Sequence, residues 1–130
     1  MDIVVIGQNN DVKNAISGML NDKPGFQVSK VAFEKPIKNH EISLLENAGI
    51  IIIDLSTARA NTRFLIMEIR EIFPEARIIA LHIYKDIYLV KPIIEAGADA
   101  YLVVDTLPRE LLKSIGEIRT GNKFISSEVK

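Results

Sequence analysis

The fold is decided by the stretch Ile50-Ile51-Ile52-Ile53-Asp54-Leu55, in which four β-branched residues lead into a carboxylate. A continuous apolar run of this length, bounded by a glycine and by a polar Ser-Thr pair, predicts a strand that is buried on both faces, as in a parallel sheet. Ligands of open parallel sheets bind beyond the carboxyl ends of the strands, and Asp54 lies at such an end. An aspartate after a strand also commonly forms a turn or caps a helix, so both interpretations of Asp54 stay open.

The composition is that of one ordinary domain. The chain has 130 residues, with 16 basic and 17 acidic side chains and a net charge of −1, which gives no electrostatic footprint for nucleic acid or an anionic membrane. The absence of cysteine excludes disulfides, thiolate zinc sites and a cysteine nucleophile, and it fits a reducing compartment, so we expect a cytoplasmic protein. The start of the chain lacks the features of a signal peptide, and no apolar run approaches the ~18 residues of a membrane span.

The remaining periodicity predicts a regular alternation of strands and helices. Apolar or alternating runs predict further strands at 3–6, 26–31, 77–81 and 100–104, the second of them at a sheet edge. Helical spacing predicts helices near 12–20, 36–47, 65–72, 86–96 and 108–118. Pro92 falls inside the fourth helix and removes one backbone hydrogen bond, so we expect that helix to be kinked or to start late.

This order of elements predicts an α/β fold. Five strands that alternate with five helices through short connections form a doubly wound five-stranded parallel sheet with helices on both faces. No internal repeat, low-complexity tract or interdomain linker is visible, so residues 1–130 are expected to form one domain.

Several stretches carry a resemblance to a known family: Ile50 to Asp54, Phe73 to Leu81, Glu95 to Leu102, Leu107 to Leu112 and Gly121 to Val129. Together they resemble the CheY-like receiver domain of bacterial response regulators, most closely the LuxR/NarL-type branch. The resemblance implies the strand order 2-1-3-4-5 of flavodoxin-like proteins. It also implies a longer regulator, in which a C-terminal helix-turn-helix domain, absent here, would provide the contact with DNA.

The resemblance implies phosphoryl transfer from a histidine kinase to Asp54. Receivers assist this reaction with a Mg²⁺ ion, held by two acidic residues after the first strand, and with a lysine after the fifth strand. Here the acidic positions are Gly7 and Gln8, and the lysine position is Val104. The small hydroxyl residue that ends the fourth strand in the family is His82 in this chain.

The substituted positions leave few metal ligands. Asp54, the backbone carbonyl of Ser56 and the amide oxygen of Gln8 are candidates, but Mg²⁺ sites depend on carboxylates, so we expect weak binding. The Pro and Gly usual after the phosphoacceptor are replaced by Ala58 and Thr62.

Two aromatic positions have open roles. His82 is predicted either to donate to a phosphoryl oxygen or pair with Asp54, which would make the pocket sensitive to pH, or simply to fill space. Tyr101 matches the aromatic residue whose rotamer reports phosphorylation in the family. A tyrosine at the start of a strand is also favourable packing, so its switch role is likewise open.

We therefore expect an atypical receiver that is not an enzyme, needs no cofactor beyond weakly bound Mg²⁺, and signals through protein contacts as a homodimer. A histidine kinase or another signalling protein is the expected partner, and no membrane is. The alternative within the family is a conventional phosphoacceptor that uses Asp54. The alternative of another class is a flavodoxin-like ligand-binding or dimerisation module, although the loop after the first strand lacks a glycine-rich phosphate cradle.

Overall fold

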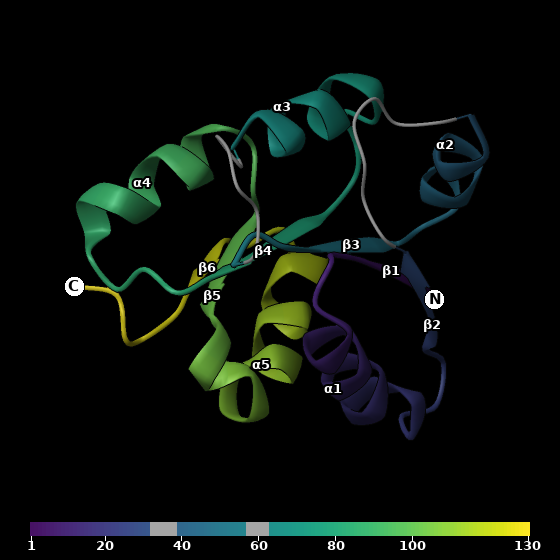
Figure 1. Ribbon diagram of the computed structural model, residues 1–130, viewed down its shortest axis with the longest axis horizontal. Coiled ribbons are helices and arrows are strands. Elements are labelled where there is room, and N and C mark those ends of the chain that lie inside the picture. Colours follow the sequence, from purple (N-terminus) through teal and green to yellow (C-terminus); the bar gives the residue numbers. More distant parts are fainter. Residues whose placement is uncertain (32–38, 57–62) are drawn as a thin grey trace.

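The structure is a computed structural model, and it describes residues 1–31, 39–56 and 63–130, with the side chains of 39–41 also left aside. A single parallel sheet with the strand order β2-β1-β3-β4-β5-β6 forms its centre (Figure 1). The strands are β1 (Asp2–Ile6), β2 (Gln27–Val31), β3 (Ile50–Asp54), β4 (Ile78–His82), β5 (Ala100–Val103) and β6 (Phe124–Ile125). The helices are α1 (Asn10–Asn21), α2 (Asn39–Glu46), α3 (Arg63–Ile72), α4 (Ile87–Glu95) and α5 (Leu107–Arg119), with a 3₁₀ turn η1 (Val104–Thr106) before α5.

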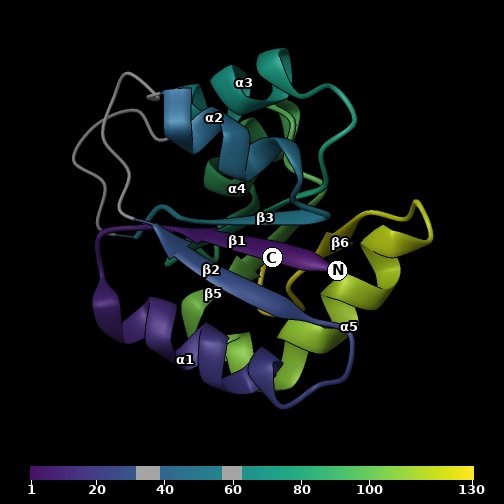
Figure 2. The ribbon, with the colours of Figure 1, turned by 90° about the vertical axis from the view of Figure 1, so that its right-hand side faces the viewer.

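Helices cover both faces of the sheet, as the sequence predicts. Figure 2 shows α1 and α5 on one face and α2, α3 and α4 on the other. The isoleucine run of β3 divides between the two sides, because successive side chains of a strand point to opposite faces. Ile51 and Ile53 join the core with α3 and α4, whereas Ile50 and Ile52 join the core with α1 and α5. All five residues of β3 are buried, which confirms a central strand.

The prediction of five strands is wrong by one, because the sheet has six. The additional strand β6 lies parallel to β5 at the edge of the sheet. Its pairing rests on the amides of Phe124 and Ser126, which donate to the carbonyls of Asp99 and Tyr101 at 3.1 and 2.8 Å. A strand of two residues is too short to produce a periodic pattern in the sequence.

The prediction for Pro92 is also wrong, because α4 begins directly after its cap residue Asp86 and continues without a break to Glu95. Proline removes the bond that would end on the carbonyl of Tyr88. Tyr88 is 82% exposed, so this carbonyl belongs to a residue on the solvent side. The loss of one backbone hydrogen bond on the solvent-exposed side of a helix disturbs the helix less than the same loss in a buried helix, because water can bind the free carbonyl.

The other boundaries follow the sequence closely. Asn9 caps α1 through its side chain, and β2 lies at the sheet edge, as predicted. The apolar spacing of the last helix predicts that Leu111, Leu112, Ile115 and Ile118 face the core; this is correct except for Leu112, which is 44% exposed. The predicted helix start at 36–38 and the loop after Ser56 lie outside the described residues.

Candidate functional site

Asp54 is the last residue of β3, and its carboxylate is nearly enclosed, with 5% of the residue exposed. Its Oδ1 atom accepts hydrogen bonds from the Ser56 amide at 3.0 Å and from the Ser56 hydroxyl at 2.6 Å. This is the turn-forming role of an aspartate after a strand. Its Oδ2 atom is buried without a hydrogen-bond partner among the described residues. Oδ1 thus builds the turn, whereas Oδ2 takes no part in it.

Gly7 lies directly against Asp54. A Cβ atom at position 7 would come within 2.9 Å of the Asp54 Cβ atom, closer than real Cβ atoms approach, and would lie at an ordinary contact distance of 3.6 Å from Oδ2. The Gly7 amide donates to the carbonyl of Val31 at 3.1 Å, which ties the end of β1 to β2. Gln8 follows as an exposed residue. The end of β1 therefore brings backbone, and no carboxylate, to the side of Asp54.

His82 ends β4 and is 7% exposed. Its Nδ1 atom accepts the amide of Ile83 at 2.8 Å, so a neutral ring carries its proton on Nε2. Burial lowers the pKa of His82, and the negative charge of Asp54 acts in the opposite direction. The ring also stacks on Tyr84 with centroids 4.1 Å apart. His82 thus fills the space beside the pocket as a desolvated ring that still interacts with Asp54.

Val104 and Tyr101 lie on opposite sides of the sheet. Val104 is half-buried at the start of η1 and packs against the core shared with α1 and α5. Tyr101 is fully buried in the core shared with α3 and α4, and its hydroxyl donates to the carbonyl of Tyr84 at 2.8 Å. Burial raises the pKa of the Tyr101 phenol above its ordinary value, so the hydroxyl keeps its proton and remains a donor.

The residues beside Asp54 do not fit the Mg²⁺ site that the fold implies. A protein Mg²⁺ site uses one or two carboxylates, in near-octahedral geometry. Among the described residues at these positions, Asp54 supplies the carboxylate, with Oδ2 unpartnered, whereas Gly7 offers no side chain and Gln8 offers an amide. Among the described residues no group of three or more His, Cys, Asp or Glu side chains is placed to hold a metal ion.

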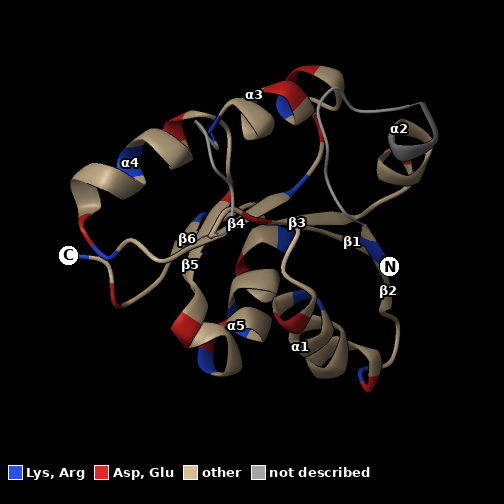
Figure 3. Cartoon of the chain, in the orientation of Figure 1, with Lys and Arg blue, Asp and Glu red and all other residues tan. Residues whose placement is uncertain are grey.

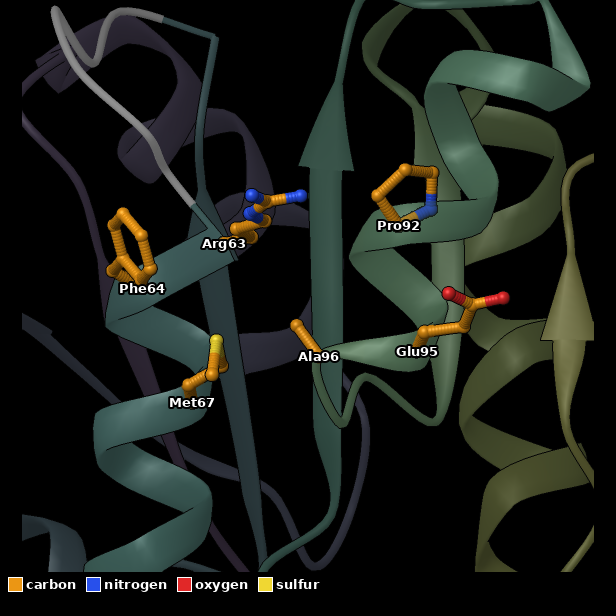
Figure 4. A pocket seen from close by; sticks show the side chains of 6 residues that line it. All are labelled: Arg63, Phe64, Met67, Pro92, Glu95 and Ala96. Carbon is orange, nitrogen blue, oxygen red and sulfur yellow. The ribbon is translucent and has the colours of Figure 1, made fainter.

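A surface cavity of about 320 Å³ lies between α3 and α4. Its lining comes from both helices and is mostly apolar, as the labelled side chains in Figure 4 show: Arg63, Phe64, Met67, Pro92, Glu95 and Ala96. None of the predicted site residues lines it. Basic and acidic residues are mixed along the helices in Figure 3, in keeping with the net charge of −1. In the described part of the chain, no helix is long and apolar enough to cross a membrane.

Sequence reasoning missed one polar cluster at the C-terminal end of the chain. Glu110 of α5 is 6% exposed, and its carboxylate accepts the Ser126 hydroxyl at 2.6 Å and the Ser127 amide at 3.1 Å. Burial works to raise the pKa of Glu110, but the hydrogen bonds led by Ser126 bring it below its ordinary value. The available signal was a glutamate between Leu107 and Ser114 on the core-facing stripe of the helix.

Comparison with known structures identifies the fold. The isolated receiver domain of RcsB from Salmonella enterica serovar Typhimurium, in its apo form, matches 98% of this chain and 94% of its own with a TM-score of 0.84 at 20% identity. A LuxR-family two-component response regulator from Aurantimonas sp. SI85-9A1 matches 98% of this chain and 91% of its own with a TM-score of 0.82 at 21% identity. The chain therefore has the fold of these receiver domains.

Sequence comparison finds a relative among the response regulators. No protein-family model matches the chain. The nitrate/nitrite response regulator protein homolog of Haemophilus influenzae is 33% identical over 92 residues, which make up 68% of this chain and 43% of that protein. The chain thus spans less than half the length of this relative. The resemblance to response regulators of the LuxR/NarL type is confirmed.

Proposed function

We propose that this receiver is atypical, takes little or no phosphate in a Mg²⁺-dependent reaction, and signals through contacts with other proteins rather than as an enzyme. The observation that carries the proposal is the close approach of Gly7 to Asp54, with a Cβ position only 2.9 Å from the Asp54 Cβ atom. The first acidic position of the pocket is thus occupied by backbone. A carboxylate there would require the end of β1 to move.

The other pocket positions support the same proposal. Phosphoryl transfer depends on cations and donors that are already in place where charge develops. Gln8 and Val104 are uncharged, and the neutral His82 ring points one nitrogen at the backbone of Ile83. Asp54 Oδ1 is already engaged by Ser56. A phosphoryl group on Asp54 would therefore meet few compensating charges.

The second candidate is a conventional phosphoacceptor. It is favoured by one observation, the Asp54 Oδ2 atom, which is buried and has no hydrogen-bond partner among the described residues. A nucleophilic oxygen needs to be free of competing donors, and this one is. The proposed role of Tyr101 as a switch belongs with this candidate, because the family's signal starts at the phosphoryl group.

Incubation with a small-molecule phosphodonor and Mg²⁺, read by intact mass, tests between the two candidates. We expect neither the wild-type protein nor the Asp54→Asn variant to gain the mass of a phosphoryl group. A phosphorylated fraction that appears in the wild-type protein and disappears in Asp54→Asn would establish the conventional mechanism instead. The receiver domain of RcsB serves as the positive control for the donor and the buffer.

We further infer that residues 1–130 form the N-terminal receiver of a longer cytoplasmic regulator of transcription, in which a downstream helix-turn-helix domain contacts DNA. The greater length of the nitrate/nitrite regulator homolog supports this inference. Homodimerisation and contact with a histidine kinase or another signalling protein are proposed on the same resemblance. Sedimentation at several concentrations tests the dimer, and a monomer at high concentration would contradict it.

A further inference from the structure

The end of the chain is bound along the side of the domain. We call residues 124–130 the C-terminal strap. It starts as β6 on the edge of β5, is fixed to α5 where Glu110 accepts from Ser126 and Ser127, and ends beside the start of α4, as Figure 1 shows. Along the way Val129 packs against the core that contains Tyr101.

The outer end of the strap is bound to the β4–α4 loop, residues 83–86. The Lys130 amide donates to the carbonyl of Lys85 at 2.9 Å, and the Ile87 amide donates to the carbonyl of Lys130 at 3.0 Å. These two bonds flank Asp86 in the pattern of a parallel strand pair. The Ile87 amide is also one of the first amides of α4, which have no partner within the helix, so the strap completes the N-terminal cap of α4.

The same loop is bound to the pocket from its other side. The Tyr84 ring stacks on His82, and the Tyr84 carbonyl accepts the buried hydroxyl of Tyr101. The backbone of Tyr101 also holds the strap, since its carbonyl accepts the Ser126 amide at 2.8 Å. Tyr101 therefore contacts both partners, with its hydroxyl on the loop and its backbone on the strap.

We propose that the C-terminal strap is coupled to the Asp54 pocket through the β4–α4 loop, so that a displacement of Tyr84 at the pocket releases the outer end of the strap at Lys130. The coupling goes beyond the proposed function, because it requires only that the loop moves and not that Asp54 is phosphorylated. It is also reciprocal, as any coupling between two sites must be, so release of the strap changes the environment of Tyr84 and His82.

The first test removes the contact between loop and strap. Ile87 is the first residue of α4, where proline is well tolerated, and Asp86 before it has the extended backbone that proline requires, with φ −84° and ψ 122°. Ile87→Pro deletes the amide that donates to Lys130, while Ile87→Ala keeps it. We expect Ile87→Pro to raise amide hydrogen exchange at Lys130 about fivefold, the loss of one ordinary hydrogen bond, and to shift the ring resonances of Tyr84 and His82. Ile87→Ala should leave both at their wild-type values, and identical behaviour of the two variants would overturn the proposal.

The second test starts from the opposite end. Tyr101→Phe removes the hydroxyl that holds Tyr84 and keeps the buried ring. We expect exchange at the Ile87 and Lys130 amides to rise about fivefold, while the amides of Phe124 and Ser126 in β6 keep their protection. Unchanged exchange at Ile87 and Lys130 would show that the strap does not sense the loop. An equal rise at all four amides would show general loosening of the strap, and would also overturn the proposal.

Discussion

The backbone of Gly7 lies so close to Asp54 that a Cβ atom on Gly7 would stand 2.9 Å from the Asp54 Cβ atom. Gly7 is at an ordinary backbone angle, so its role is close approach and not a special conformation. Position 7, which matches an acidic position of receivers, therefore has no room for a side chain unless the backbone moves. The end of β1 has taken the space that a side chain would need.

This packing predicts opposite effects of the same substitution at two glycines. Gly7→Ala should destabilise the domain by about 1–3 kcal/mol, because an added methyl group in a full site forces the backbone to shift. Gly18→Ala, in the interior of α1 with nothing within 4 Å of the added atom, should stabilise it by about 0.5–1 kcal/mol. Urea unfolding measures both. A Gly7→Ala variant as stable as the wild type would show that the end of β1 yields easily.

A carboxylate introduced at position 8 should strengthen Mg²⁺ binding without the steric clash that a side chain at position 7 would cause. The wild-type protein is expected to bind Mg²⁺ no more tightly than about a millimolar, because a single carboxylate and an amide form a poor site. Gln8→Asp adds a carboxylate at an exposed position and should tighten binding by about tenfold. A Mg²⁺ titration followed by amide chemical shifts measures both affinities.

The control for this titration is Gln8→Asp combined with Asp54→Asn. If Asp54 is a ligand, the double variant should lose the gain that Gln8→Asp brings. Adding Gly7→Asp is expected to lower stability in chelator, through the clash and through repulsion between carboxylates, and Mg²⁺ should restore part of the loss. Tight binding by the wild-type protein would mean that ligands outside the pocket positions take part.

The sheet and its layers were predictable because their signals are local. Runs such as 3–6 and 50–53 are continuous and β-branched, and each is long enough to identify a buried strand. The strand order and the pocket positions came from the resemblance to receivers, and the observed order of the first five strands agrees with it. β6 could not be predicted because a strand of two residues is too short to show a hydrophobic period. The effect of Pro92 on α4 could not be predicted because the sequence does not show which side of that helix faces solvent.

Contacts between distant loops had no sequence signal. Arg70 in α3 donates to the carbonyls of Gly97, Pro74 and Ala76 and pairs with Asp99 at 2.9 Å. Most of these partners are backbone carbonyls, which every residue has, so nothing in the sequence marks them. The spacing of 27 residues between Arg70 and Gly97 becomes a contact only after the sheet has formed.

Arg70 should accordingly tolerate no conservative replacement. Arg70→Lys keeps the charge but replaces a planar group with five donors by a single ammonium, so several carbonyls lose their partner and the domain should lose about 2–3 kcal/mol. Arg109→Lys is the matched control, because Arg109 is 66% exposed and pairs only with Glu128, at 3.3 Å. Its effect should stay within about 0.5 kcal/mol. Equal effects in urea unfolding would mean that Arg70 is an ordinary surface cation.

The buried carboxylate of Glu110 should give a stability contribution that disappears in acid. Its pKa in the folded protein lies below the ordinary value, so the contribution is complete above the unfolded pKa of about 4.3 and is lost as the pH falls through the folded pKa. Glu110→Gln should therefore cost about 1.5–3 kcal/mol at pH 7, as for a hydrogen-bonded charge, and progressively less below about pH 4. Glu128→Gln, at a half-buried glutamate that pairs with the exposed Arg109, should cost much less at pH 7. A cost for Glu110→Gln that does not change with pH would contradict an ionised Glu110.

His82 should make the domain less stable below neutral pH. Burial lowers its pKa in the folded protein, so between the folded pKa and the unfolded pKa of about 6.5 the unfolded chain binds the additional proton. Stability is therefore complete above about pH 6.5 and declines as the pH falls toward the folded pKa, below which the loss is constant. His82→Asn keeps an acceptor for the Ile83 amide and has no titrating ring, so its urea unfolding should lose less stability between pH 7.5 and pH 5.5 than the wild type. His40→Asn, at the other histidine of the chain, separates the two contributions.

The charge of Asp54 opposes the shift, so Asp54→Asn should lower the pKa of His82 further, which a titration of the His82 ring signals measures directly. A His82 pKa that does not change in Asp54→Asn would mean that the charge of Asp54 does not act on the His82 ring.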